Sequence, residues 1–318
     1  MTVLIRHWSF DPVLVVIGIT VLVHARGLLL RLAAMRRTGR PIAPWIWQAV
    51  LFWLSLVMLI VAICSPIDYY SSSYLTSHIV EHIILSFFAP PLLVLGAPWL
   101  PLLRGLPRPW RTWLGRLAQR TRMPGGERRS GLGSSAPGSA RAISTSGAAY
   151  RGLARVRRVA SRPLTSVVAF NVAMLFWHLP GPYDLAETNQ VVHIWFEHGS
   201  FFLLGLALWL QVFGSYPLRP LLPGPRRIGS LLASNGVMVV VAMTLVMFAH
   251  DPYAVYNGLH SASVQHADQQ IGGAILWVCG EITFMPSILY TMAKWLRERE
   301  PMEDEPLPGM VASSAGAA

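Results

Sequence analysis

Seven apolar runs, each close to the length that crosses a bilayer, constrain this chain more than any other feature of its sequence. A helix needs roughly 20 apolar residues to cross a hydrocarbon core of about 30 Å. Apolar residues make up 53% of the 318-residue chain, too many for an ordinary soluble domain. The runs predict an all-α polytopic membrane protein with seven transmembrane helices, at about 12–32, 45–64, 76–97, 163–178, 191–212, 229–250 and 270–293.

The runs divide the chain into four regions. Residues 1–98 hold the first three predicted helices, and residues 163–296 hold the last four. Residues 99–162 are rich in Gly, Ser, Ala and Arg without apolar periodicity, which predicts a basic, disordered cytoplasmic insert. Residues 297–318 are expected to form a disordered cytoplasmic tail.

Positive charge lies in alternate connections. Basic residues follow the first, third, fifth and seventh runs, with fourteen arginines between Arg104 and Arg162. The connections 65–75, 179–190 and 251–269 contain no Lys or Arg. Because basic loops are retained in the cytoplasm, we expect the N-terminus outside and the C-terminus inside. The net charge of +11 therefore indicates orientation in a lipid bilayer rather than nucleic-acid binding.

The three outer connections are built alike. They contain AICSPIDYY, FWHLPGPYD and FAHDPYAVY, each with a metal-capable side chain two residues before a proline and a tyrosine close behind. The metal-capable residues are Cys64, His178 and His250, and a histidine follows each of them 14, 15 and 16 residues later, at His78, His193 and His266. This repeat predicts one lone helix and three helical hairpins, each presenting ligands at its outer corner.

Histidines gather on the outer side of the predicted bundle. Eight of the ten lie there: His78, His82, His178, His193, His198, His250, His260 and His266. Such crowding favours a metal site, and imidazole suits zinc, copper and iron, whereas sulfur selects Cu(I). The alternative is that each histidine caps helix carbonyls or lies among lipid head groups.

Two returning segments place an acid directly before a histidine. In SHIVEHIIL, His78, Glu81 and His82 share one helix face because they are three and four residues apart. In VHIWFEHGS, His193 and Glu197 share a face, and His198 follows. An ionisable residue in a membrane helix is costly and indicates function, and a carboxylate can orient a metal-bound imidazole. The alternative is a Glu–His hydrogen bond that joins two helices.

Three stretches resemble the signature regions of the CtaG-type cytochrome c oxidase assembly factors of bacteria. They are YLTSHIVEHIILSFFAPPLLVLGAP, FWHLPGPYDLAETNQVVHIWFEHGSFFLLGLALW and ADQQIGGAILWVCG, in that order. The resembling residues are His78, His82, Pro90, Pro91, Gly96, Trp177, His178, His193, Glu197, His198, Asp268, Gln269 and Gln270. The resemblance implies a bacterial inner-membrane protein that is needed to make active haem-copper oxidase and handles copper.

Residues and resemblance together predict a non-enzymatic assembly factor that binds copper, as Cu(I), on its outer face and passes it on by ligand exchange. The expected partners are oxidase subunits or other assembly factors. The expected ligands are His78, His82, His178, His193, His198, His250, His266 and Cys64. Charge compensation and imidazole orientation are expected from Glu81, Glu197 and Asp268.

Two other functions remain open. HIVEH matches the His-x-x-Glu-His pattern of zinc peptidases, in which the glutamate acts as base, whereas HIWFEH has one residue too many. A single outer haem held by one histidine from each of two facing helices is the second alternative. A two-haem transmembrane wire is excluded, because no histidine pair falls at the predicted membrane centre or inner side.

Overall fold

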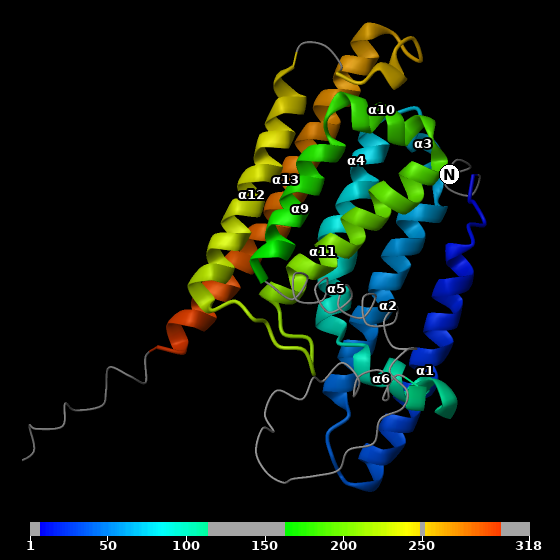
Figure 1. The fold of residues 1–318 in the computed structure, drawn as a ribbon, viewed down its shortest axis with the longest axis vertical. Helices are drawn as coiled ribbons and strands as arrows, with labels where there is room; N and C mark the ends of the chain where they lie inside the picture. Colours follow the sequence, from blue (N-terminus) through cyan, green and yellow to red (C-terminus); the bar gives the residue numbers. More distant parts are fainter. Residues whose placement is uncertain (1–6, 114–162, 249–251, 300–318) are drawn as a thin grey trace, which may run out of the picture.

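The computed structural model describes residues 7–113, 163–248 and 252–299, and within these ranges the chain is helical without a β-strand (Figure 1). The first half contains α1 (Val13–Arg37), α2 (Ala43–Cys64), α3 (Pro66–Ser71), α4 (Leu75–Ile83), the π-helix η1 (Ile84–Phe88), α5 (Ala89–Gly96) and α6 (Trp99–Gly105). The second half contains α9 (Pro163–Trp177), α10 (Pro180–Thr188), the π-helix η2 (Val192–His198), α11 (Gly199–Val212), α12 (Gly224–Met247), the 3-10 helix η3 (Ala254–Tyr256) and α13 (Ala262–Arg297).

Among the described residues, five helices are long and apolar enough to cross a membrane. They are Val13–Arg37, Ala43–Ser71, Leu75–Gly96, Gly224–Met247 and Ala262–Arg297. A sixth is present if Leu164–Trp177 and Pro180–Thr188, which meet at 78°, form one bent span. The predicted polytopic all-α fold is thus confirmed within the described residues, but seven spans are not. The predicted span 191–212 is covered by η2 and α11, which are not among the five.

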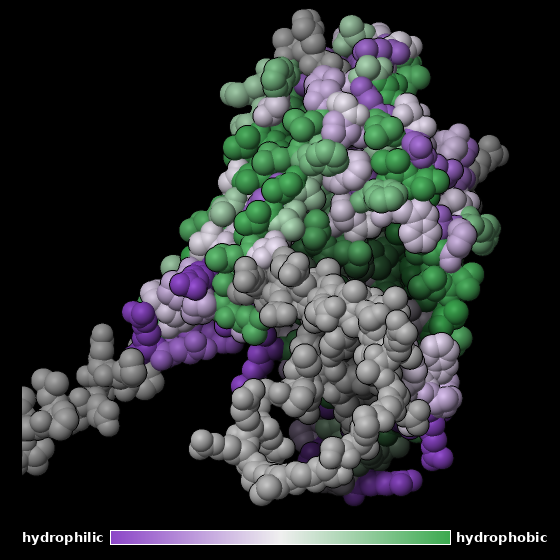
Figure 2. Space-filling view, viewed as in Figure 1, coloured by the Kyte–Doolittle hydropathy of each residue, from purple (hydrophilic) through white to green (hydrophobic). Residues whose placement is uncertain are grey.

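Helices that are close in sequence pack in pairs. The α2 helix packs against α5, α9 against α11, and α12 against α13 (Figure 1). The α4–α5 span lies centrally, since 78% of its apolar stretch is buried, against 22% for α1. Hydrophobic residues cover much of the described surface in Figure 2, and the most hydrophilic residues lie near its top, at the upper right, at the lower left and at the bottom. This distribution suits a bundle surrounded by lipid.

The segment that follows α5 begins with a short helix, α6. The α6 helix packs on α1 through two glycines, Gly27 and Gly105. A Cβ on Gly27 would lie 1.8 Å from the carbonyl oxygen of Pro101, and one on Gly105 would lie 1.8 Å from that of Val23. Only glycine permits this approach. Residues 99–105 and 108–113 of the predicted disordered insert are helical, whereas residues 114–162 of the insert and residues 300–318 of the tail lie outside the described residues.

Two prolines explain a contact that holds α11 against η1. The carbonyl of Ser86 would normally accept from the backbone N–H four or five residues later, but those positions are Pro90 and Pro91, which have no N–H. The indole Nε1 of Trp209 donates to this carbonyl instead, at 3.0 Å. A Cβ on Gly205 would lie 3.1 Å from the same oxygen, so α11 passes close to the π turn.

The substitution Trp209→Phe is expected to destabilise the bundle by about 1–3 kcal/mol, because it leaves a buried carbonyl without a donor. Unfolding of the purified protein in detergent measures this. The matched control is Trp195→Phe, since Trp195 is 68% exposed on the bundle surface and its loss should change stability little. Equal stability of both variants would show that the Trp209 contact contributes nothing.

Candidate metal centre

Seven ionisable side chains meet inside the bundle, near the end where α3 and α10 lie (Figure 1). They are His78, Glu81 and His82 from α4, Glu187 from α10, and His193, Glu197 and His198 from η2. The exposed fraction is 0% for His78, Glu81 and Glu197, and at most 8% for His82, His193 and His198. We call these seven residues the His–Glu centre.

The glutamates of the centre contact histidines of the opposite helix. Oε1 of Glu197 lies 3.6 Å from Nε2 of His78 and 3.6 Å from Nε2 of His82. On the other side, the Glu81 carboxylate lies 3.9 Å from Nε2 of His193 and 3.4 Å from Nε2 of His198. Each acid therefore faces the two imidazoles of the other motif.

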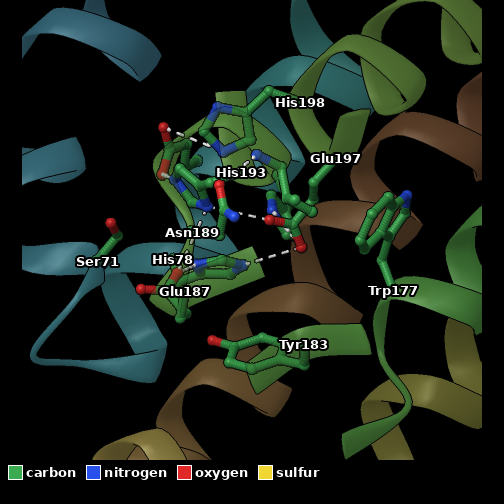
Figure 3. Close-up of polar contacts among 12 residues, drawn as sticks. Ser71, His78, Trp177, Tyr183, Glu187, Asn189, His193, Glu197 and His198 are labelled. Atoms are coloured by element: carbon green, nitrogen blue, oxygen red, sulfur yellow. Dashed lines mark hydrogen bonds and ion pairs between the residues drawn. The ribbon is translucent and has the colours of Figure 1, made fainter. Parts of the chain in front are cut away.

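Glu187 of α10 contacts one histidine of each motif. Its Oε1 contacts Nδ1 of His78 and lies 3.6 Å from Nδ1 of His193. Nδ1 of His193 also lies 3.0 Å from Oε2 of Glu197. Figure 3 shows His78 between Glu187 and Glu197, with a contact from each ring nitrogen. A carboxylate on Nδ1 fixes the orientation of an imidazole and leaves its Nε2 directed towards a metal ion.

The π turn of η2 explains how its longer motif reaches the centre. In an α-helix, residues five apart point about 140° away from each other, so His193 and His198 would diverge. A π-helix closes its hydrogen bond between residues five apart, so His193, Glu197 and His198 come to one side. The additional residue in HIWFEH is therefore accommodated by the backbone.

Many polar atoms of the centre have no hydrogen-bond partner in the described protein. Both oxygens of Glu81 and both ring nitrogens of His82 and His198 are in this state, as is Oε1 of Glu197. An unpaired buried polar group is costly, and its presence indicates a bound ion or water. Three sets of ligand atoms lie within 4.8 Å of one another: His78, His82 and Glu197; His78, Glu187 and His193; and Glu81, His193 and His198. The centre therefore fits a metal ion.

His178 lies beside the centre with one nitrogen available. Its Nδ1 is 2.7 Å from the carbonyl of Met174, and because a carbonyl only accepts, Nδ1 carries the proton and donates. Nε2 is buried and has no partner among the described residues. The ring centroid lies 6.1 Å from that of His82. His178 is in none of the three ligand sets, so its predicted ligand role stays a prediction.

The three connections that the sequence predicts on the outer side contact one another and form a cap over the centre. Tyr183 of α10 stacks on Tyr253 with ring centroids 3.7 Å apart, and its ring centroid lies 4.7 Å from that of His78. The Tyr183 hydroxyl lies 2.7 Å from that of Tyr256, which donates to the carbonyl of Ser71 at 2.8 Å. Each of the three outer connections therefore supplies one member of this hydrogen-bonded chain.

Asp268 and Gln269 of the ADQQ segment form hydrogen bonds with backbone groups at the ends of two helices. The Asp268 carboxylate accepts from the backbone N–H of Leu75, at 2.6 Å, and from that of Thr76. It therefore caps the N-terminus of α4. Nε2 of Gln269 donates to the carbonyls of Leu245 and Phe248, at the C-terminus of α12. Asp268 thus positions α4, whereas the sequence predicted that it compensates charge or orients imidazoles.

Other predicted ligands lie elsewhere. Cys64 is buried at the C-terminus of α2, where its carbonyl accepts from the backbone of Ser9, and it is in none of the three ligand sets. His266 on α13 is also in none of them. His250 lies outside the described residues. His260 donates to the carbonyl of Ser73 and stacks on Tyr74 in the cap. Ligand roles for Cys64, His250 and His266 stay predictions.

Sequence reasoning missed Glu187 and Tyr256. Glu187 lies in a connection that contains no Lys or Arg, so no basic residue near it in the sequence could pair with its carboxylate. An acid without a basic neighbour could have indicated a carboxylate that contacts the histidines. Tyr256 belongs to the same repeat as Tyr183 but lies further beyond its proline, where the motif gave no reason to select it.

Comparison with known proteins identifies the family. A family model described as cytochrome c oxidase caa3 assembly factor (Caa3_CtaG) matches residues 27–123 and 132–298. The uncharacterized protein ML1998 of Mycobacterium leprae is 27% identical over 306 residues, and Mb0105 of Mycobacterium bovis is 26% identical over 305. Each alignment covers 92% of this chain but 40% of the relative, so the chain spans less than half of their length. No solved structure matches. The chain belongs to the caa3-type cytochrome c oxidase assembly factor family.

Proposed function

We propose that this chain binds copper in the His–Glu centre and delivers it to a cytochrome c oxidase during assembly. Family membership supports the assembly role and indicates a non-enzymatic protein. The observation that carries the metal role is a buried group of imidazoles and carboxylates in which several ligand atoms have no hydrogen-bond partner among the described residues. Such a group is stabilised when a cation is bound.

The donor atoms bear on the identity of the metal. Imidazole suits copper, zinc and iron, and nitrogen with oxygen donors in a tetragonal arrangement suits Cu(II). The three ligand sets contain no thiolate, since Cys64 lies apart from them. This donor set favours Cu(II) over the Cu(I) that the sequence predicted, because Cu(I) prefers sulfur ligands.

The crossed contacts favour metal binding over peptidase chemistry. A base in a His-x-x-Glu-His peptidase acts beside the zinc held by its own two histidines. Here the Glu81 carboxylate lies against His193 and His198 of the other helix, where it serves as a ligand or charge partner. We further propose that the centre faces the extracytoplasmic side of the inner membrane, since the adjoining connections lack Lys and Arg.

The test compares two outer histidines in a strain that lacks the chromosomal copy of this chain. Wild-type protein should carry copper when purified and restore oxidase activity. His82→Ala should lose most of both, because it removes one imidazole of a ligand set. The matched control His260→Ala removes an imidazole of the cap and should retain both. Copper content by elemental analysis and cytochrome c oxidation by membranes are the readouts.

Two results would contradict the proposal. If His82→Ala protein lacked copper but still restored normal oxidase activity, copper binding would not be needed for assembly. If purified wild-type protein carried zinc and no copper, the proposed cargo would be wrong. Cys64→Ser is expected to leave copper content unchanged, because Cys64 lies outside the ligand sets. A fall in copper for Cys64→Ser would restore the sequence-based prediction that this thiol is a ligand.

A further inference from the structure

The two motifs of the His–Glu centre are equivalent once the π turn is taken into account. The α4 motif has two residues between its first histidine and its glutamate, and the η2 motif has three. An α-helix aligns residues three and four apart, whereas a π-helix aligns residues four and five apart. Each motif therefore presents histidine, glutamate and histidine on one side of its helix.

The distances repeat in matched pairs. Ring centroids within a motif lie 4.1 Å apart for His78 and His82, and 4.1 Å apart for His193 and His198. Between the motifs, the centroids of His78 and His193 lie 5.4 Å apart, and those of His82 and His198 lie 5.6 Å apart. The crossed glutamate contacts repeat as well. The centre is thus an approximate two-fold arrangement of two half-sites.

Each half-site has its own unpaired ligand atoms. Nε2 of His82 and Oε1 of Glu197 lie 3.6 Å apart in the first, and Nε2 of His198 and Oε1 of Glu81 lie 3.4 Å apart in the second. None of these four atoms has a hydrogen-bond partner among the described residues. Seven ionisable side chains also exceed the ligands of one transition-metal ion, which binds about four to six. Three carboxylates in a buried site would offset most of the charge of two divalent cations.

We infer that the His–Glu centre binds two borderline divalent cations, such as Cu(II) or Zn(II), side by side. One is held by His78, His82 and Glu197, and the other by His193, His198 and Glu81. Glu187 is a positioning residue for both, because one of its oxygens contacts Nδ1 of His78 and faces Nδ1 of His193. This inference rests on the proposed function only in that the centre holds metal.

The test is the number of Cu(II) ions bound per full-length chain in detergent, measured by titration of metal-depleted protein and by elemental analysis after gel filtration. Wild-type protein should bind two. Glu81→Gln and Glu197→Gln should each bind one, because each removes a ligand from a different half-site. Glu281→Gln is the matched control, since this carboxylate accepts from Asn235 away from the centre and should leave two ions bound.

A second readout separates half-site loss from misfolding. Two adjacent Cu(II) ions couple magnetically, so doubly loaded wild-type protein should give less paramagnetic signal than two isolated ions. Each single glutamine variant should elute in gel filtration like wild-type protein, which excludes gross misfolding, and should give the full signal of one isolated ion. Wild-type protein that binds one ion would overturn the two-ion inference and leave copper delivery intact. Wild-type protein that binds none would overturn the delivery role itself.

Discussion

Replacing His78 by alanine is expected to lower the affinity of the purified chain for copper by at least about a hundredfold and to abolish oxidase assembly. The His78 side chain contacts Glu187 through Nδ1 and faces Glu197 through Nε2, so its loss affects both half-sites. Removing one partner of a buried charged pair also costs about 3–5 kcal/mol of stability. Copper titration and unfolding of the same preparation measure the two effects.

The matched control is His24→Ala, because His24 is also a buried intramembrane histidine, 1% exposed, but packs on Phe52 away from the centre. It should retain copper. The variant His78→Gln keeps a donor for Glu187 and should fold better than alanine while still binding copper weakly. Equal copper loss in His24→Ala and His78→Ala would show that the effect comes from general destabilisation rather than from the ligand.

A periplasmic reporter inserted after Tyr70, Thr188 or Ala262 is expected to be active, whereas one after Ser135 should be silent. The first two sites lie in α3 and α10, which adjoin the His–Glu centre at one end of the bundle (Figure 1). Arginines gather in the connection that contains Ser135, and basic connections are retained in the cytoplasm. Reporter activity on intact cells measures the orientation.

A cytoplasmic reporter at the same four positions is the control, and it should give the opposite pattern. If both reporters placed the α3 and α10 ends in the cytoplasm, the His–Glu centre would face inward. The cargo would then come from the cytoplasmic pool, and the proposed direction of delivery would be wrong.

Spacing alone predicted the α4 half of the centre. His78, Glu81 and His82 are three and four residues apart, and helix geometry places such residues on one face whatever surrounds the helix. Five of the predicted spans, which match the five long apolar helices of the described residues, likewise follow from composition, because lipid requires each backbone group to bond within its own helix. Local rules sufficed for these features.

The remaining features depend on contacts between distant segments. The crossed contacts of Glu81 and Glu197 arise only when α4 and η2 pack together, and no local pattern specifies that pairing. Asp268, which caps α4 at Leu75, belongs to α13 and lies 193 residues further along the chain. Cys64 and His178 each lie two residues before a proline in the repeat. The proline determines where the helix ends but not where the side chain before it points. Register and direction are set by tertiary packing.

The extra residue in the π turn of η2 also determines at which positions of Val192–Val212 the protein tolerates a one-residue deletion. Losing one of the three residues between His193 and Glu197 would convert the π turn to an α turn and recreate the spacing of the α4 motif. A one-residue deletion anywhere within α11 would rotate the helix beyond it by about 100°. Before Trp209, that rotation would turn the indole away from Ser86 and detach α11 from η1. Relatives that differ in length along Val192–Val212 are therefore expected to differ inside the motif, which a search with fixed spacing would overlook.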